Sequence, residues 1–235
     1  MKIRCVWEHN GDDSILYAVE PVGAFTRGKC REEAIRKMPA EIGSYLNWLG
    51  EVPADPIELA ITQEKASGLT VSDADSDVLF DEERQPLSMD EYTELKALAL
   101  RSAHDFQTLY ESIPDKGRSC LPFRKTFYGQ VPRTADEMYE HTKNVNAYYF
   151  AEIGIDADND GSIFECRQRG FALLEKQPDF LENRVFEGSY GEDWSLRKLL
   201  RRFVWHDRIH AKAMTRMAVM TFGADSIPDV FFFNM

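Results

Sequence analysis

The chain has 235 residues, of which 43% are hydrophobic and 12% aromatic, and its formal net charge is −12. This length and composition suffice for two domains with hydrophobic cores, and no stretch approaches the roughly 18 apolar residues of a membrane-spanning helix. An acidic chain without a concentrated basic face also argues against nucleic acid as the main partner, because neutralising phosphates requires clustered Lys and Arg.

The N-terminus and the cysteines favour a cytoplasmic location. Residues 1–8, Met-Lys-Ile-Arg-Cys-Val-Trp-Glu, break any signal-peptide pattern with charged side chains. Four scattered cysteines lack metal-motif spacing and suit reduced, mostly structural thiols (Cys5, Cys30, Cys120 and Cys166). We therefore expect a soluble protein of the cytosol.

Residues 1–68 have the pattern of a small α+β domain. Apolar and polar residues alternate on both sides of a turn at residues 10–13, which predicts a β-hairpin with apolar positions Ile3, Cys5, Trp7, Ile15, Tyr17 and Val19. A helix is predicted next, with apolar positions Ala34, Ile35, Met38, Ile42, Tyr45 and Leu46. A further strand, residues 57–62, follows the prolines of residues 53–56. His9, beside Asn10 and Gly11, is predicted to be a turn residue.

This first region resembles the HicB-like antitoxin fold over residues 1–65. The resemblance rests on Tyr-Ala-Val-Glu-Pro at residues 17–21, a Gly-x-Phe-Thr-x-Gly step at residues 23–28, and Cys-Arg-Glu-Glu-Ala-Ile-Arg at residues 30–36 followed by Ile-Gly-Ser-Tyr-Leu. HicB-like antitoxins bind a toxin and usually have a separate DNA-binding segment, which nothing in this chain matches. The resemblance therefore implies a protein partner or a homodimer contact, and neither toxin nor operator binding.

Residues 69–86 are predicted to form an acidic linker between two domains. Between residues 69 and 90, seven acidic side chains are accompanied only by Arg84, so this stretch holds −6 of the net charge of −12. Acids, serines and Pro86 are typical of a solvated connector. Val78, Leu79 and Phe80 are apolar enough to anchor the connector on a domain surface.

From residue 87 onward the periodicity is helical. We predict helices at residues 87–114, 133–153, 162–176 and 193–222, with a long connection at residues 115–132. Thr134 and Glu137 form a capping box at the second start. Four antiparallel helices that bury facing seams make an up-down four-helix bundle over residues 87–235. The apolar tail at residues 230–233 is expected to pack back on the bundle. The predicted fold class is thus α+β followed by all-α.

Three histidines lie at core-facing positions of the predicted helices. His206 and His210 replace apolar residues in the seam of the last helix and are four residues apart, a spacing at which two imidazoles can bind one metal ion. His141 lies on the apolar face of the second bundle helix. His104 is off the seam of its helix and is predicted to be solvated. Core histidines are often satisfied by a carbonyl or a carboxylate instead, so metal binding and a structural role both stay open.

The segments around these histidines resemble DinB-like, YfiT-type metal-binding four-helix bundles over residues 87–222. The matching segments are Pro-Arg-Thr-Ala-Asp-Glu-Met-Tyr-Glu-His at residues 132–141, Trp-Ser-Leu-Arg-Lys-Leu-Leu at 194–200 and Trp-His-Asp-Arg-Ile-His at 205–210. The resemblance implies that His141, His206 and His210 hold a divalent metal such as Zn, Ni, Fe or Mn. It also implies a small-molecule substrate and a metal-dependent transferase that uses a low-molecular-weight thiol, or a hydrolase. The rival hypothesis is a non-catalytic protein whose bundle site is structural.

No catalytic side chain is assigned besides these ligands. Asp207 and Glu140 are predicted to face away from the seam, so neither is expected to be a general base.

Residues 156–161 match the start of an EF-hand loop, but the twelfth position is Arg167 instead of Glu, so we expect an acidic loop that caps the next helix. The basic residues of the last helix are predicted to form a solvated or salt-bridged outer face (Arg197, Lys198, Arg201, Arg202, Arg208, Lys212 and Arg216).

Overall fold

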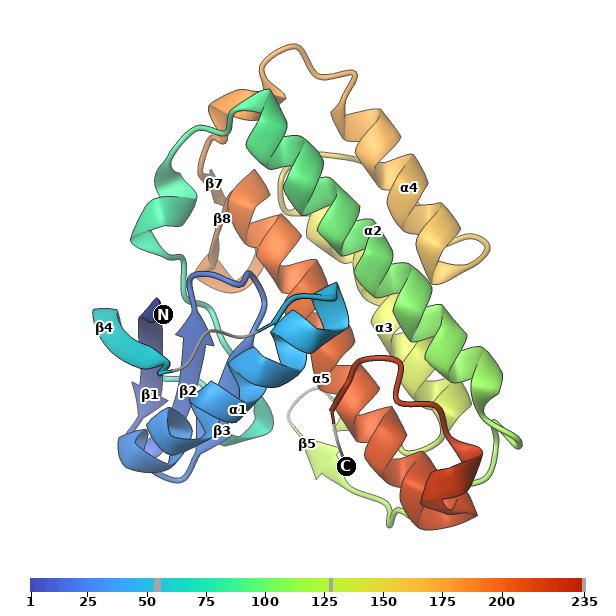
Figure 1. Cartoon of the computed structure of the whole chain (residues 1–235). Helices are drawn as coiled ribbons and strands as arrows, with labels where there is room; N and C mark the ends of the chain where they lie inside the picture. Colours follow the sequence, from blue (N-terminus) through green and yellow to red (C-terminus); the bar gives the residue numbers. More distant parts are fainter. Residues whose placement is uncertain (53–55, 127–128, 234–235) are drawn as a thin grey trace.

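The computed structural model describes residues 1–52, 56–126 and 129–233 and combines a small sheet with a group of long helices (Figure 1). The sheet contains β1 (Lys2–Asn10), β2 (Asp13–Ala18), β3 (Phe25–Gly28) and β4 (Glu58–Ala66), in the order β3-β2-β1-β4. β2 runs antiparallel to β1 and β3, and β4 runs parallel to β1. Helix α1 (Arg31–Leu49) connects β3 to the outer strand. The predicted α+β pattern is confirmed.

Three details of this region differ from the sequence-based expectation. β3 was not predicted because four residues are too few for an alternating pattern to be visible. β4 is longer than the predicted strand at residues 57–62, and most of the proline connection before it lies outside the described residues. The turn prediction for His9 is wrong, because this residue lies in β1 and pairs with Ser14 of β2.

Both faces of the sheet are buried, and the predicted linker forms one of the covers. Helix α1 packs on one face through Ala34, Met38, Ile42 and Tyr45. Val71, Val78 and Phe80 cover the opposite face and are at most 2% exposed. The anchoring by residues 78–80 is thus confirmed, but the prediction of a solvated connector is wrong for this middle part of the segment. Its short 3-10 helices η1 (Val71–Asp73) and η2 (Asp81–Arg84) lie against the rest of the protein.

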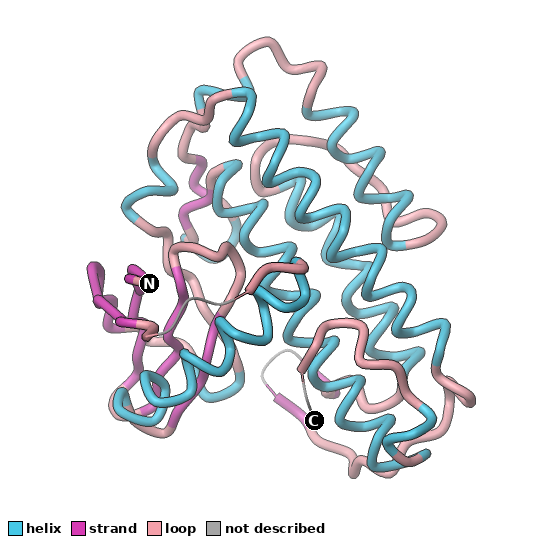
Figure 2. The backbone as a smooth tube through the Cα atoms, viewed as in Figure 1, coloured by secondary structure: helices cyan, strands magenta, loops and turns pink. Residues whose placement is uncertain are grey.

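The helical region contains α2 (Met89–Ser112), α3 (Ala135–Ala151), α4 (Ile163–Leu174) and α5 (Leu196–Phe222), as predicted to within a few residues (Figure 2). Three of these helices begin with a capping box, in which a Ser or Thr accepts from a backbone N–H and a Glu three residues later reaches back to the cap. Two short antiparallel strand pairs interrupt the connections: β5 (Lys125–Thr126) with β6 (Gly129–Gln130), and β7 (Phe186–Glu187) with β8 (Asp193–Trp194).

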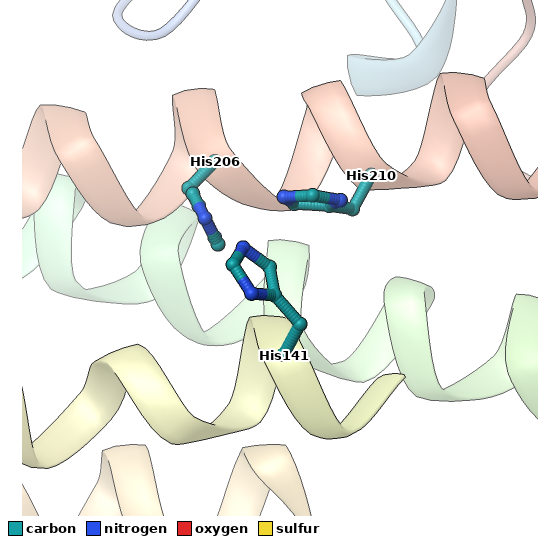
Figure 3. Close-up of side chains that lie close together, drawn as sticks. All are labelled: His141, His206 and His210. Atoms are coloured by element: carbon teal, nitrogen blue, oxygen red, sulfur yellow. The ribbon is translucent and has the colours of Figure 1, made fainter. Parts of the chain in front are cut away.

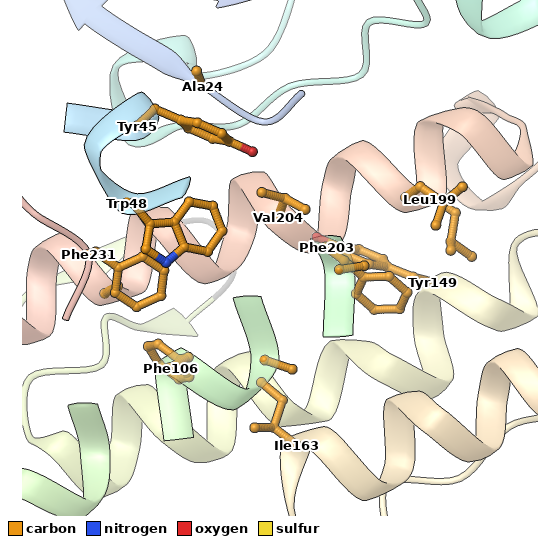
Figure 4. Packing of buried hydrophobic residues seen from close by; sticks show 14 of the residues in the cluster. Ala24, Tyr45, Trp48, Phe106, Tyr149, Ile163, Leu199, Phe203, Val204 and Phe231 are labelled. Carbon is orange, nitrogen blue, oxygen red and sulfur yellow. The ribbon is translucent and has the colours of Figure 1, made fainter. Parts of the chain in front are cut away.

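Helix α5 lies between the sheet region and the other long helices, so one hydrophobic core joins both parts of the chain (Figures 1 and 4). Phe203 of α5 packs against α3 and α4 through Tyr149, Phe150 and Phe171. On the other side Val204 lies in the same core as Tyr45 of α1. The C-terminal tail does pack back, since Phe231 is 1% exposed and stacks on Trp48 of α1.

The basic residues of α5 do not form a solvated outer face. Lys198, Arg201, Arg202 and Arg208 are buried. Arg201 forms an ion pair with Glu83 of η2, and Arg208 forms one with Glu41 of α1. The prediction of salt bridges was right, whereas the prediction of solvation was wrong because α5 is surrounded by the rest of the chain. No helix within the described residues is long and apolar enough to cross a membrane.

Candidate metal centre

The fold brings the three predicted ligand residues together between α3 and α5. His206 and His210 point from successive turns of α5 toward His141 on α3 (Figure 3). The ring centroids are 4.5 Å apart for His206 and His210, 4.6 Å for His141 and His210, and 5.3 Å for His141 and His206. One ring nitrogen of each residue lies within 4.8 Å of those of the other two. The core-facing positions that periodicity predicted are thus brought into one cluster, and its use as a metal site stays a prediction.

The surroundings of the cluster keep the imidazoles uncharged. Burial lowers the pKa of His210 to about 3, and the neighbouring His141 ring and the Arg27 guanidinium act in the same direction. Burial also lowers the pKa of His206 well below its ordinary value, helped by the two other rings and by Arg202. His141 is the most exposed of the three, and partial desolvation lowers its pKa as well. Neutral imidazole is the form that binds a metal ion.

One nitrogen of the cluster lacks a hydrogen bond. Among the described residues nothing donates to or accepts from Nδ1 of His206, although the residue is only 8% exposed. Leaving a buried polar atom unpaired costs about 1 to 3 kcal/mol. A metal ion would satisfy such a ring nitrogen. The donor set and the unpaired atom therefore fit a divalent ion.

The cluster lines a cavity of about 370 Å³. The walls come from five parts of the chain: residues 69–77, the segment next to β5 and β6 (Arg124, Thr126 and residues 130–132), α3, residues 190–192, and α5. Aromatic and aliphatic side chains make up much of the lining, including Val145, Tyr148, Tyr149, Trp205 and Ile209. A closed four-ligand structural site has no such space, whereas a catalytic site keeps a coordination position open to it.

Charged groups at the wall are joined in ion pairs. Asp73 pairs with Arg124 at 2.8 Å. Glu192 is 8% exposed and pairs with Lys198 at 2.8 Å and with Arg202 at 3.3 Å. The first pair links the predicted linker to the segment before β5, and the other two link the 190–192 loop to α5. They hold the wall in place around the histidines.

The structure settles the position of the other residues that were considered. His104 is solvated as predicted, with 67% of its side chain exposed. Glu140 is exposed, and Asp207 points away from the histidines, where it pairs with the buried Arg167. Neither carboxylate lines the cavity, which agrees with the prediction that neither is a general base. The cysteines are free, and Cys5 and Cys166 are buried.

The acidic loop at residues 156–161 is occupied by contacts within the protein. Asp158 forms an ion pair with Arg169, and the Asn159 side chain accepts a hydrogen bond from the backbone of Ala147. The next helix, α4, is capped by the hydroxyl of Ser162, with Glu165 completing the capping box. The prediction that the acidic loop itself caps this helix is therefore wrong by one residue, because the first residue after the loop supplies the cap.

Sequence reasoning missed most of the cavity wall. Residues 69–77 were assigned to a connector, and Tyr190 and Glu192 were not considered. The only available signals were the apolar Val71 and the glycines at positions 188 and 191, which mark a tight turn. No signal in the sequence linked these segments to the histidines, because their proximity depends on the packing of α5 against the sheet.

Comparisons with known proteins identified no relative of this chain. No protein-family model matches the chain, and neither the curated proteins nor the solved structures contain a significant match.

Proposed function

We propose that this chain is a divalent-metal-binding protein of the DinB-like type, with His141, His206 and His210 as the protein ligands. The observation that carries the proposal is that three neutral imidazoles from two helices converge on one cavity wall. Imidazole suits Zn, Ni and Fe among the divalent ions, with Mn as a further candidate. The helical fold and the helix positions of the three ligands support the DinB-like resemblance.

The open side of the cluster favours a reactive ion over a structural one. Three protein ligands leave coordination positions for water, a thiolate or substrate, and a divalent ion lowers the pKa of bound water or thiol toward neutrality. The residues of this chain would supply the ligands, the partly apolar wall and the fixed charges. On this basis the proposed activity is that of a metal-dependent transferase using a low-molecular-weight thiol, or of a hydrolase, acting on a small molecule in the cytoplasm.

The N-terminal region supports a HicB-like assignment through its strand order and single covering helix. Its sheet has both faces covered by this same chain, by α1 and by residues 71–80. A protein partner or a second copy would therefore bind at its outer edges. The alternative function, in which the histidine site is structural and the N-terminal region recruits a partner, differs from the leading proposal in one measurable property, the exchange of ligands at the ion.

Metal binding is tested by metal analysis of the purified protein and by thermal melting with and without chelator. An ion present at 1,000 times its dissociation constant stabilises the folded state by about 4 kcal/mol. We expect added Zn²⁺ or Ni²⁺ to raise the melting temperature of the stripped protein. His206→Ala and His210→Ala should abolish this rise, whereas the matched control His104→Ala should keep it. Equal melting curves with and without ion in the unaltered protein would overturn the proposal.

Ligand exchange separates the two functions. In Co²⁺-substituted protein, an open site changes its visible absorption when a thiol or azide binds, because the coordination sphere changes. Bacillithiol, mycothiol, glutathione and coenzyme A are the thiols to screen. A spectrum that responds to one of them supports the transferase reading. A Co²⁺ spectrum that responds to none of the thiols and not to azide would indicate a closed, structural site.

A further inference from the structure

Tyr190 is a large aromatic residue that the fold presents to solvent beside the histidine cavity. It is 92% exposed and lies among the residues that line this cavity. No hydrogen bond or ring contact joins its side chain to another residue within the described part of the chain. An exposed tyrosine ring that contributes nothing to packing has a large surface available for a ligand.

The backbone of Tyr190 is held in an unfavourable conformation. Its φ of 61° and ψ of 18° lie in the left-handed region, which is sparsely populated by residues other than Gly, Asn and Asp. Such strain persists only where the surroundings enforce it, and it is frequent at ligand-binding sites.

The surrounding loop is firmly anchored. The backbone N–H of Ser189 donates to the Glu152 carboxylate at 2.7 Å, and Gly188 N–H donates to the Glu192 carbonyl at 2.9 Å. Gly188 also lies so close to Trp194 that a Cβ atom would collide with its ring. These contacts therefore fix the backbone of Tyr190, and with it the point from which the ring extends beside the cavity.

The composition of the adjacent wall indicates what this ring contacts. Tyr148, 37% exposed, lines the same cavity, and Trp205 and Val145 continue the apolar surface toward the histidines. From this arrangement we infer that Tyr190 is a specificity-determining residue, which covers the flat, apolar part of a substrate whose polar head reaches the three histidines. The substrate class is thus a small molecule with an aromatic or similarly planar group. This inference rests on the proposed metal-binding function.

Two hydroxamates test the inference on the Zn²⁺-loaded full-length protein. Acetohydroxamate and benzohydroxamate share the same metal-binding head and differ in a methyl against a phenyl group. Isothermal titration gives the affinity of each. We expect Tyr190→Ala to lower the ratio of benzohydroxamate to acetohydroxamate affinity by about fivefold, the size of a lost aromatic contact. Tyr190→Phe should keep the ratio within about twofold, since the ring remains.

The matched control is Phe186→Ala, which removes an exposed aromatic residue of the same loop region that does not line the cavity. This variant should leave the ratio unchanged. If acetohydroxamate binds and the ratio is the same in the unaltered protein and Tyr190→Ala, the inference is wrong while metal binding stands. If the protein holds no ion and binds neither hydroxamate, the proposed function fails, and the inference fails with it.

Discussion

Acidification of the metal-free protein is a direct test of the buried histidine cluster. The pKa of His210 falls from its ordinary value of 6.5 to about 3 in the folded state. Between these values the unfolded chain binds a proton that the folded chain does not, so the free energy of unfolding decreases as the pH falls. One pH unit in this window corresponds to about 1.4 kcal/mol. Lowering the pH from 7 to 5 should therefore cost about 2 kcal/mol through His210 alone.

The assay is urea unfolding at pH 7 and pH 5 in the presence of EDTA, followed by circular dichroism. His210→Gln keeps a polar side chain without a titrating group, so the variant should lose about 2 kcal/mol less than the unaltered protein over this interval. His206 shifts in the same direction and should behave alike. Titrating groups far from His210 are common to both proteins, so their effects cancel in the comparison. An equal loss in the two proteins would refute the claim that the fold keeps His210 neutral.

Three substitutions test other parts of the structure. Asp207→Asn removes the charge that compensates the buried Arg167. It should lower the free energy of unfolding, measured by urea titration, by about 3 to 5 kcal/mol. A loss below about 1 kcal/mol would contradict a stabilising role of this buried pair. Glu83→Gln should cost about 3 kcal/mol and speed proteolytic cleavage within residues 69–86. The neighbouring Glu82→Gln, at an exposed pair, should change stability by less than about 1 kcal/mol, and equal effects of the two would refute a specific role of the buried pair. Tyr190→Gly should be more stable than Tyr190→Ala by about 1 kcal/mol, because only glycine relieves the left-handed strain, and equal melting curves would show that no strain is present.

The helices were predictable because the signals that form them are local. Thr134 and Glu137 lie within one turn of each other and fix the start of α3 wherever the rest of the chain packs. The inward position of His206 and His210 also follows from the spacing of apolar residues along one helix. To predict that these histidines form one cluster, one must also know that α3 and α5 are neighbours. The resemblance implied this arrangement, whereas periodicity could not.

The role of residues 69–86 was not predictable for the opposite reason. A solvated acid and a buried, paired acid look the same in a sequence. Glu83, unlike Glu82, faces Arg201, which lies more than a hundred residues later. Val71 and the apolar trio at residues 78–80 were the local signs of burial. Long-range pairing of this kind is decided by where α5 passes, not by the composition of the segment itself.

The central position of α5 has a consequence for the site. Trp205 precedes His206 and packs against Tyr17 and Phe25 of the sheet, at centroid distances of 5.9 and 6.0 Å. Successive residues of one helix thus bind the sheet and line the histidine cluster, so the orientation of α5 cannot change at one without changing at the other. Because residues 69–77 pack on the sheet and also form a wall of the cavity, the N-terminal region contributes to the shape of the site.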